Sequence, residues 1–413
     1  MHPFRDHLRT ALSSRGTPPP LRSGRTCEGL DGRPCRLCHA ARWSYDDERQ
    51  ARDTALRSFW REHGGDDTLL TPLVPSPPGR RYRTVTKRKV FTRRNAPFLA
   101  LLAPDEDGEF APLAVLDCAI EPASHTAVYA RVGELLVKPY ARALAETLRY
   151  VVVRGGGAEQ TVILNVRAID GPAAKAASTM SKTLARSLPG LAAMFLYEDT
   201  TDGRYYLGTR SPQARPVVRK IFGRDQLLEI IEGRRFLFSP LAFSQINQAL
   251  FGAMVGEARS RLAGAGAQHL VDLYCGYGPF ALCLADGFRR VTGVDVSRAS
   301  VEAARANAER QTVAHAGFLQ ADLTGESLGR LLREDGGGTA VILDPPRTGT
   351  APGVIEAVAR IRPLRVVHCF CAVDLAPAEL QRWEACGYRP TAVVPFDMFP
   401  GTDSVELMAV LQR

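Results

Sequence analysis

Two glycines and a carboxylate are spaced so that they could hold a nucleoside. Gly276 and Gly278 form a Gly-x-Gly turn in VDLYCGYGPF, where an apolar run ends and a helix is expected to begin. Glycines there let the backbone approach a ligand closely. Asp295 ends the next apolar run, 17 residues after Gly278, and could accept hydrogen bonds from both hydroxyls of a ribose. The full Gly-x-Gly-x-x-Gly pattern fails at Ala281, so a plain strand–turn–helix with a capping Asp is the alternative.

Two further apolar runs end in residues that could do chemistry. VILDPPRTG places Asp344 before Pro345 and Pro346, which stiffen the backbone at the carboxyl edge of a sheet, where doubly wound folds bind ligands. RVVHCFC ends in Cys371, which is either a nucleophile or a buried core residue. Cys369 lies two residues earlier on the same face of the strand.

A group of cysteines near the N-terminus has metal-ligand spacing. TCEGLDGRPCRLC places Cys27, Cys35 and Cys38 as Cys-x7-Cys-x2-Cys, and Cys118 is the candidate fourth ligand. A Cys-x2-Cys turn lets two thiolates bind one metal centre, and this spacing suits either zinc or an iron–sulfur cluster. Nine cysteines without a secretion signal argue against a disulfide framework.

The elements that must position these residues suggest two domains behind a tail. Residues 1–26 are expected to be a flexible basic leader, because they are rich in Pro and Arg. Residues 27–238 are predicted to be a β-rich region that binds RNA. A helix over 43–63 could pack on the next domain, and a second helix is expected over 172–188. Hairpins are expected at Gly155–Gly157 and in EDTTDGRYYLG. Residues 239–413 alternate apolar strands with Ala-rich helices, which predicts a parallel sheet of Rossmann-like α/β type.

Composition fits a protein with a polyanionic partner. The 413 residues carry a net charge of +9, and the segment 79–95 is rich in Lys and Arg and has no acid. Aromatic and aliphatic residues alternate with these cations, which favours strands that lie along phosphates. No run of 18 apolar residues exists, so no transmembrane helix is expected.

Motifs across most of the chain resemble one family. They are FSPLAFSQINQ (238–248), VILDPPRTG (341–349), RVVHCFCAVDL (365–375) and FDMFPGTDSVE (396–406). With these motifs in this order, the chain from about residue 27 onward resembles the RNA uracil-5 methyltransferases. The resemblance implies that S-adenosylmethionine is the methyl donor and makes Cys371 the nucleophile and Glu406 the general base. It also implies a cofactor site that consists of Gln245, Tyr274, Gly276, Asp295 and Asp344. This sequence departs from the usual family pattern at Phe370 and Ala372, which flank the cysteine.

The cysteine spacing resembles one branch of that family. The branch methylates 23S ribosomal RNA and carries a [4Fe–4S] cluster on four cysteines, which implies a cluster on Cys27, Cys35, Cys38 and Cys118, with zinc as the lesser alternative. The branch lacks an N-terminal TRAM domain, and none is expected here. The expected enzyme is a 23S rRNA (uracil(747)-C(5))-methyltransferase, a cytoplasmic monomer whose partner is RNA and neither DNA nor membrane.

Three alternatives stay open. The same chemistry could act on transfer RNA. An adenine amino-methyltransferase is disfavoured, because that class usually has an aromatic residue where this chain has Arg347. A catalytically idle RNA-binding assembly factor is the alternative from another class.

Overall fold

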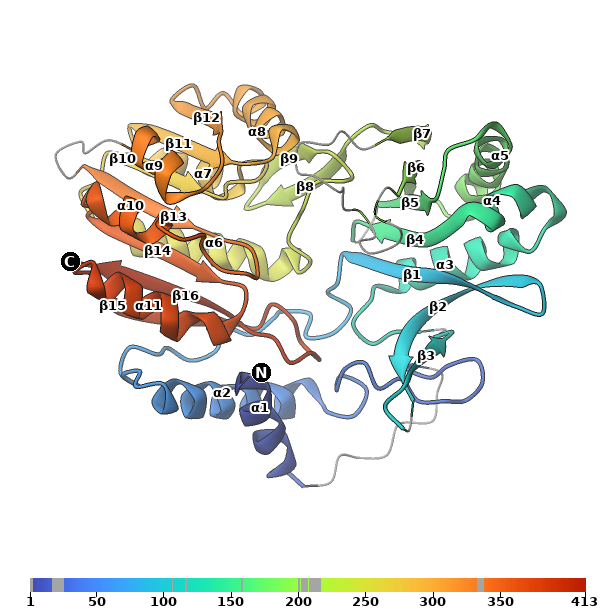
Figure 1. The fold of residues 1–413 in the computed structure, drawn as a ribbon, viewed down its shortest axis with the longest axis horizontal. Coiled ribbons are helices and arrows are strands. Elements are labelled where there is room, and N and C mark those ends of the chain that lie inside the picture. Colours follow the sequence, from blue (N-terminus) through green and yellow to red (C-terminus); the bar gives the residue numbers. More distant parts are fainter. Residues whose placement is uncertain are drawn as a thin grey trace. The chain divides into compact units, whose positions relative to one another are not determined.

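The chain folds into two compact units in a computed structural model that describes residues 3–16, 26–105, 107–115, 117–156, 159–199, 201, 207, 217–332 and 338–413. The parallel-sheet unit comprises Met1–Pro18, Ser44–Gly79 and Leu228–Arg413. The cysteine unit comprises Pro19–Trp43 and Arg80–Leu227. The cysteine unit is therefore inserted within the sequence of the other (Figure 1).

A seven-stranded sheet in the order β12-β11-β10-β13-β14-β16-β15 forms the centre of the parallel-sheet unit. Its strands are β10 (His269–Leu273), β11 (Arg290–Asp295), β12 (Ala316–Gln320), β13 (Thr339–Leu343), β14 (Arg365–Phe370), β15 (Arg389–Phe396) and β16 (Glu406–Gln412). The pairs among β10 to β14 are parallel, and β16 runs antiparallel to both β14 and β15. From β10 the chain adds β11 and β12 toward one edge of the sheet, and it then adds β13 and β14 toward the other edge. The direction changes between β10 and β13, and such a switch point is where doubly wound folds bind ligands. The prediction of a Rossmann-like domain is confirmed.

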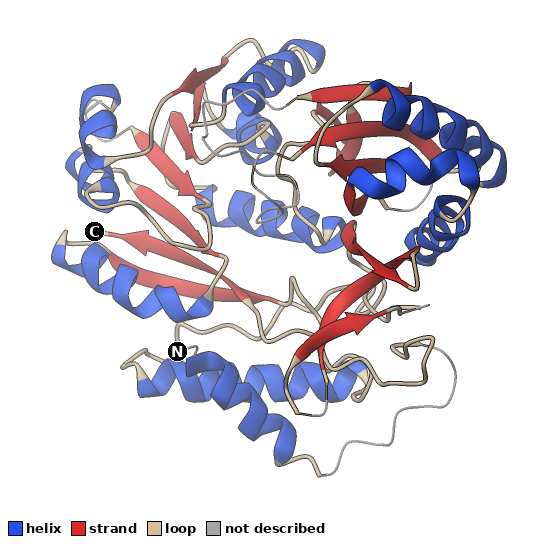
Figure 2. Ribbon diagram, turned by 45° about the vertical axis from the view of Figure 1, so that its right-hand side comes forward, coloured by secondary structure: helices blue, strands red, loops and turns tan. Residues whose placement is uncertain are grey.

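Helices connect these strands and flank the sheet (Figure 2). They are α6 (Gln248–Leu262), α7 (Pro279–Leu284), η2 (Ala285–Gly287), α8 (Arg298–Arg310), α9 (Gly325–Leu331), α10 (Val354–Arg360), η3 (Val373–Leu375) and α11 (Ala376–Ala385). The short strands β8 (Leu227–Ile231) and β9 (Arg234–Phe238) form a separate pair. This pair falls almost wholly within the parallel-sheet unit. The last segment of that unit therefore begins at Leu228, about ten residues before the predicted domain boundary at 239.

Two N-terminal helices complete the parallel-sheet unit, α1 (Pro3–Ser13) and α2 (Tyr45–Glu62). This differs from the flexible leader predicted over residues 1–26, of which 1, 2 and 17–25 lie outside the described residues. Phe4, Leu8 and Leu12 recur every four residues and are buried, so they form one apolar stripe on α1. The Phe4 and Phe59 rings meet edge to face at 6.0 Å, which joins α1 to α2.

The cysteine unit contains a second seven-stranded sheet, in the order β3-β2-β1-β4-β5-β6-β7. Its strands are β1 (Val85–Arg93), β2 (Ala96–Pro104), β3 (Phe110–Leu113), β4 (Leu148–Arg154), β5 (Gln160–Val166), β6 (Leu191–Glu198) and β7 (Val218–Gly223). Its helices are α3 (Ala123–Leu136), η1 (Pro139–Ala141), α4 (Arg142–Thr147) and α5 (Gly171–Ser187). Alternate residues of β4 and β5 pack with α3 and α5 in a single apolar core.

Local predictions for this unit have mixed outcomes. α5 confirms the helix predicted over 172–188, and the antiparallel pair β4–β5 confirms the hairpin whose glycines begin at Gly155. Gly157 and most of the hairpin predicted in EDTTDGRYYLG lie outside the described residues. No helix in the described ranges combines the length and the apolar character needed to cross a membrane.

Candidate functional site

The turn after β10 has the backbone shape that its glycines allow. Tyr274, Gly276 and Gly278 all have positive φ angles, of 65°, 55° and 89°. A Cβ atom built on Gly276 would meet no atom within 4 Å, so the space in front of this turn is open. The Tyr274 hydroxyl is buried and lies near the backbone of Ala351. The turn therefore presents open space and a buried hydroxyl at the carboxyl end of β10.

Asp295 lies beside this turn, as its position at the end of β11 predicts. Its two carboxylate oxygens accept hydrogen bonds from the Gly276 amide at 2.9 Å and the Ser297 amide at 2.7 Å. Burial raises the pKa of Asp295, and these amide bonds oppose the shift. Each oxygen retains a second lone pair that could accept a ligand hydroxyl.

Asp344 and Gln245 meet across the sequence. The Gln245 side-chain amide donates to Asp344 Oδ2 at 3.3 Å. Burial raises the pKa of Asp344 to about 6, while hydrogen bonds from Gln245 and Cys371 favour its ionised form. The site thus brings together residues from the loop before α6, the end of β13 and the end of β14.

Cys371 and Glu406 are neighbours at the ends of two paired strands. β14 and β16 are antiparallel, and the pair of Phe370 with Leu407 is the last in the ladder. Cys371 and Glu406 come next on each side of that pair, and their side chains are hydrogen-bonded. Directly opposite residues in such a ladder have Cβ atoms about 4.5–5.5 Å apart. Cys371 Sγ also lies 3.9 Å from Asp344 Oδ1 and 3.4 Å from the Pro345 carbonyl oxygen.

Burial and the negative charge of Asp344 raise the pKa values of Glu406 and Cys371 and so favour the neutral form of each. The pKa of Glu406 rises to about 8, chiefly because the side chain is buried and also because Asp344 is near. The pKa of the Cys371 thiol is raised by burial and by the charges of Asp344 and Glu406. Arg347 lowers both pKa values. Sequence reasoning did not assign Arg347 to the site, although it lies in the motif that contains Asp344.

Cys369, the neighbouring cysteine, has a different environment. It lies within β14 opposite Met408 and is 1% exposed. Cys371 lies just beyond the strand end and is half-buried. A ligand could therefore approach Cys371 more readily than Cys369.

Asp272, a buried acidic residue, was missed by sequence reasoning as Arg347 was. It is 1% exposed in β10, and one of its oxygens accepts from the Ala281 amide at 2.9 Å. Burial raises its pKa well above the usual value, and the charges of Asp344 and Asp295 add to this. An acidic residue within the apolar run HLVDL was the available signal.

The four cysteines predicted as metal ligands gather in the cysteine unit. The bridge between Thr26 and Asp117 brings Cys27 beside Cys118, and their side chains are hydrogen-bonded. Cys35 and Cys38 are close enough that their charges raise the pKa of Cys27. No three Cys, His, Asp or Glu side chains in the described ranges are arranged to hold a metal ion.

The basic segment 79–95 forms one strand, β1, and not a pair of basic strands, because its partner β2 contains no Lys or Arg. Lys87, Lys89 and Arg93 are exposed along β1, and Phe91 packs on Phe98 of β2 at 5.9 Å. Arg88 differs, because it is buried and bound through both terminal nitrogens to Glu121.

Known proteins resemble both parts of the chain. Residues 209–413 match the family described as tRNA (Uracil-5-)-methyltransferase. An uncharacterised RNA methyltransferase of Geobacter sulfurreducens is 28% identical over 93% of this chain and 75% of its own length. The 23S rRNA (uracil(747)-C(5))-methyltransferase of Cronobacter sakazakii is 27% identical over 94% of this chain and 99% of its own. Several other relatives match over about half of their length, 42–54%.

The fold also resembles a solved structure. It is that of the Pyrococcus abyssi tRNA (uracil-54, C5)-methyltransferase in complex with S-adenosyl-L-homocysteine, with a TM-score of 0.68, 21% identity, and coverage of 92% of this chain and 87% of that one. With both sheets and the site on β10, β11, β13, β14 and β16 in place, the chain belongs to the RNA uracil-5 methyltransferase family.

Proposed function

We propose that this chain methylates C5 of a uridine in 23S ribosomal RNA, with Cys371 as the covalent nucleophile and Glu406 as the base. The hydrogen bond between the Cys371 thiol and the buried Glu406 carboxyl, beside the last pair of β14 and β16, is the observation that carries this proposal. The two groups need to act on adjacent carbons of one ring, and a cross-strand pair places two side chains at that separation.

The proposed reaction begins with addition to the uracil ring. C5 is a weak nucleophile, so the Cys371 thiolate first bonds to C6, and the electrons of the C5=C6 bond move onto the C4 oxygen as an enolate. Bound S-adenosylmethionine supplies an electrophilic methyl group, which C5 then takes. The Glu406 carboxylate removes the proton from C5, the C5=C6 bond forms again, and Cys371 leaves as a thiolate.

The folded protein favours the thiol form of Cys371, because the pKa of this group is raised. Formation of the thiolate therefore requires a proton acceptor and a nearby cation. Asp344, whose Oδ1 lies 3.9 Å from the sulfur, is the carboxylate that could accept this proton, because Glu406 must be ionised to remove the C5 proton later. Arg347 favours the thiolate, since it lowers the pKa of Cys371. We therefore assign Arg347 to activation of the nucleophile.

S-Adenosylmethionine fits the remaining residues. Asp295 could hold the ribose hydroxyls, and the open space at Gly276 allows a nucleoside to approach the backbone. Tyr274, in the turn after β10, and Gln245 beside Asp344 complete the proposed cofactor site. Tyr274, Asp295 and Asp344 lie at the carboxyl ends of β10, β11 and β13, which are neighbours at the switch point.

We further propose that Cys27, Cys35, Cys38 and Cys118 hold a [4Fe–4S] cluster. Four cysteines that influence one another fit a cluster, because each binds a different iron and they need not surround one ion. Protein purified without oxygen should contain about four irons per chain, and Cys35→Ser should lose them. Zinc in place of iron would contradict this assignment.

Ribosomal RNA is the favoured substrate because the Cronobacter relative that acts on 23S RNA aligns along nearly its whole length. The exposed cations of β1 suit a phosphate backbone. Transfer RNA is the second candidate, since the family description and the Pyrococcus structure both concern that substrate. In either RNA the target base must be unstacked before a thiolate can reach C6.

Two measurements test the proposed function. Mapping of 5-methyluridine in ribosomal and transfer RNA, from cells with and without this protein, should show one lost site in 23S RNA. With purified protein, Glu406→Gln should accumulate a covalent RNA adduct that carries the methyl group, and Cys371→Ala with Glu406→Gln should not. If cells without this protein keep every 5-methyluridine in both RNAs, the idle assembly factor is favoured. If methylation proceeds without any adduct, the covalent mechanism is excluded.

A further inference from the structure

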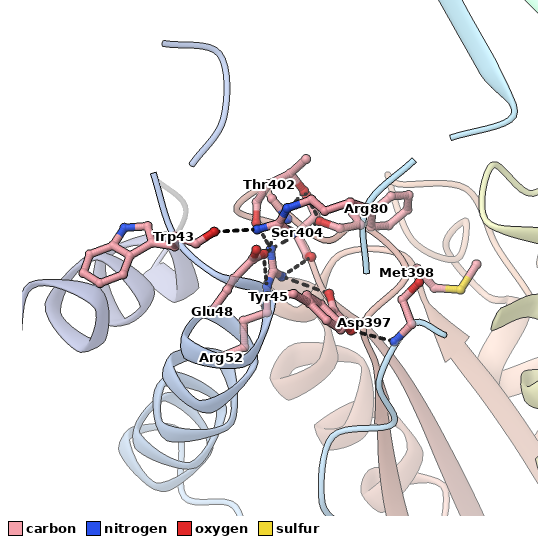
Figure 3. Close-up of polar contacts among 12 residues, drawn as sticks. Trp43, Tyr45, Glu48, Arg52, Arg80, Asp397, Met398, Thr402 and Ser404 are labelled. Atoms are coloured by element: carbon pink, nitrogen blue, oxygen red, sulfur yellow. Dashed lines mark hydrogen bonds and ion pairs between the residues drawn. The ribbon is translucent and has the colours of Figure 1, made fainter. Parts of the chain in front are cut away.

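A buried arginine on α2 contacts the segment that leads to Glu406. Arg52 is fully buried, as are Glu48, one turn earlier on the helix, and Asp397. Asp397 begins the segment 397–405, here called the base loop, which joins β15 to β16. Figure 3 shows these side chains between α2 and the base loop.

The Arg52 guanidinium binds several groups of the base loop at once. It donates to the Ser404 carbonyl at 2.8 Å and the Phe399 carbonyl at 3.2 Å, and also to the Thr402 carbonyl. Its Nη1 lies 3.5 Å from Asp397 Oδ1. One side chain therefore reaches both ends of the base loop and its middle.

Glu48 completes the arrangement from the same helix. It accepts from Arg52 Nε at 2.9 Å and from the Gly401 amide. Gly401 has a positive φ angle of 87°, so the base loop turns sharply where Glu48 binds it. Together the two α2 residues hold the backbone of the base loop at Phe399, Gly401, Thr402 and Ser404.

The ends of the base loop define the position of Glu406. Phe396 and Glu406 are paired across β15 and β16, so the base loop closes directly on the proposed base. A guanidinium has a rigid, planar set of donors that a lysine ammonium cannot reproduce. Removal of that set would leave several buried carbonyls without a donor, and the loop would have to rearrange.

We infer that Arg52, supported by Glu48, is a positioning residue that fixes the base loop and thereby places Glu406 for proton removal. This rests on the proposed function, because it assumes that Glu406 is the base. Cys371 lies on a different strand, at the end of β14. A disturbed base loop should therefore slow proton removal more than thiolate addition or methyl transfer.

The experiment compares two labels in one quenched reaction. RNA that carries tritium at uridine C5 reports proton removal as tritium released to water, and S-adenosylmethionine with a labelled methyl group reports methyl transfer. Wild type should release one tritium for each methyl transferred. Arg52→Lys should transfer methyl groups ahead of tritium release, with elimination slowed about 10- to 100-fold, since a displacement near 1 Å can cost about 100-fold.

Matched variants separate positioning from loss of stability. Phe59→Leu also alters a buried residue of α2, but its ring packs on Phe4 of α1. It should lower the melting temperature and keep the one-to-one ratio of labels. Glu48→Gln removes the carboxylate charge that pairs with Arg52 but leaves a side-chain oxygen for the Gly401 amide, so it should give a smaller excess of methyl over tritium. If Arg52→Lys does not fold, Glu48→Gln decides by the same ratio.

The outcomes distinguish failure of the positioning role of Arg52 from failure of the proposed function on which it rests. A one-to-one ratio in the Arg52 and Glu48 variants, together with an excess of methyl in Glu406→Gln, would overturn the positioning role and leave the function standing. A one-to-one ratio in Glu406→Gln would remove Glu406 as the base and overturn both. An excess in Phe59→Leu as large as in Arg52→Lys would show that general destabilisation is the cause.

Discussion

Proton removal by Glu406 should increase steeply with pH around neutrality. The pKa of this carboxyl is about 8 in the folded protein, because it is buried and close to Asp344. A group with that pKa is about one tenth ionised at pH 7 and about nine tenths ionised at pH 9. Since only the ionised form can act as a base, the rate of elimination should rise about tenfold over this range.

The covalent intermediate should leave this pKa near 8. The hydrogen bond with Cys371 favours ionised Glu406, and a sulfur bonded to C6 can no longer donate it. Protonation of Asp344 by the thiol has the opposite effect, because it removes a charge that raises the pKa of Glu406. Burial, the largest cause of the shift, remains.

Single-turnover release of tritium from uridine C5, measured at several pH values, tests this reasoning. Glu406→Gln is the matched control, and its slow release should show no such rise. An apparent pKa near the ordinary 4.5 of glutamate, with a flat profile above it, would refute the reasoning from burial. A profile unchanged in Glu406→Gln would assign the titration to another group.

Four other changes have defined outcomes. Asp295→Ala should weaken S-adenosylmethionine binding by about 1.5–3 kcal/mol in calorimetry, because the ribose loses a charged acceptor; unchanged affinity would exclude the residue from the site. Cys369→Ala should keep the covalent adduct on a denaturing gel, and loss of the adduct would shift the nucleophile by two residues. Phe4→Ala should lower the free energy of unfolding by about 3–5 kcal/mol in urea titration, and a loss below about 1 kcal/mol would mean that α1 does not pack as described. The folded pKa of Glu406 lies above 4.5, so wild type should lose stability as pH rises from about 5 through 8, whereas Glu406→Gln should lose less; equal losses in urea titrations would contradict this.

The sequence predicted the parts of the site that lie at strand ends. Gly276, Asp295 and Asp344 each follow an apolar run, and the alternation of strands and helices predicts that such ends share one edge of a sheet. The partnership of Cys371 and Glu406 came from resemblance alone. Their proximity depends on β16 inserting between β14 and β15, and no local pattern specifies that order.

The residues that sequence reasoning missed are mostly buried charges. Glu48 and Arg52 lie four residues apart in a polar helix, a pattern that usually indicates an exposed ion pair. Their burial depends on a loop about 350 residues away, which no window of sequence contains. The error over α1 has the opposite origin, because proline and arginine content outweighed the apolar stripe of Phe4, Leu8 and Leu12.

The division of the parallel-sheet unit into three separated segments has a consequence for its synthesis. The Phe4 amide binds Asp374, and Arg52 binds Ser404, across 370 and 352 residues. At roughly 5–20 residues per second, a ribosome needs about 20–70 s to extend the chain over such a distance. During that interval α1 and α2 can cover one another through Phe4 and Phe59, while the inserted cysteine unit is completed and can fold first. The base loop and Glu406 are synthesised after Cys371, so the polypeptide has no assembled catalytic pair until β16 has emerged.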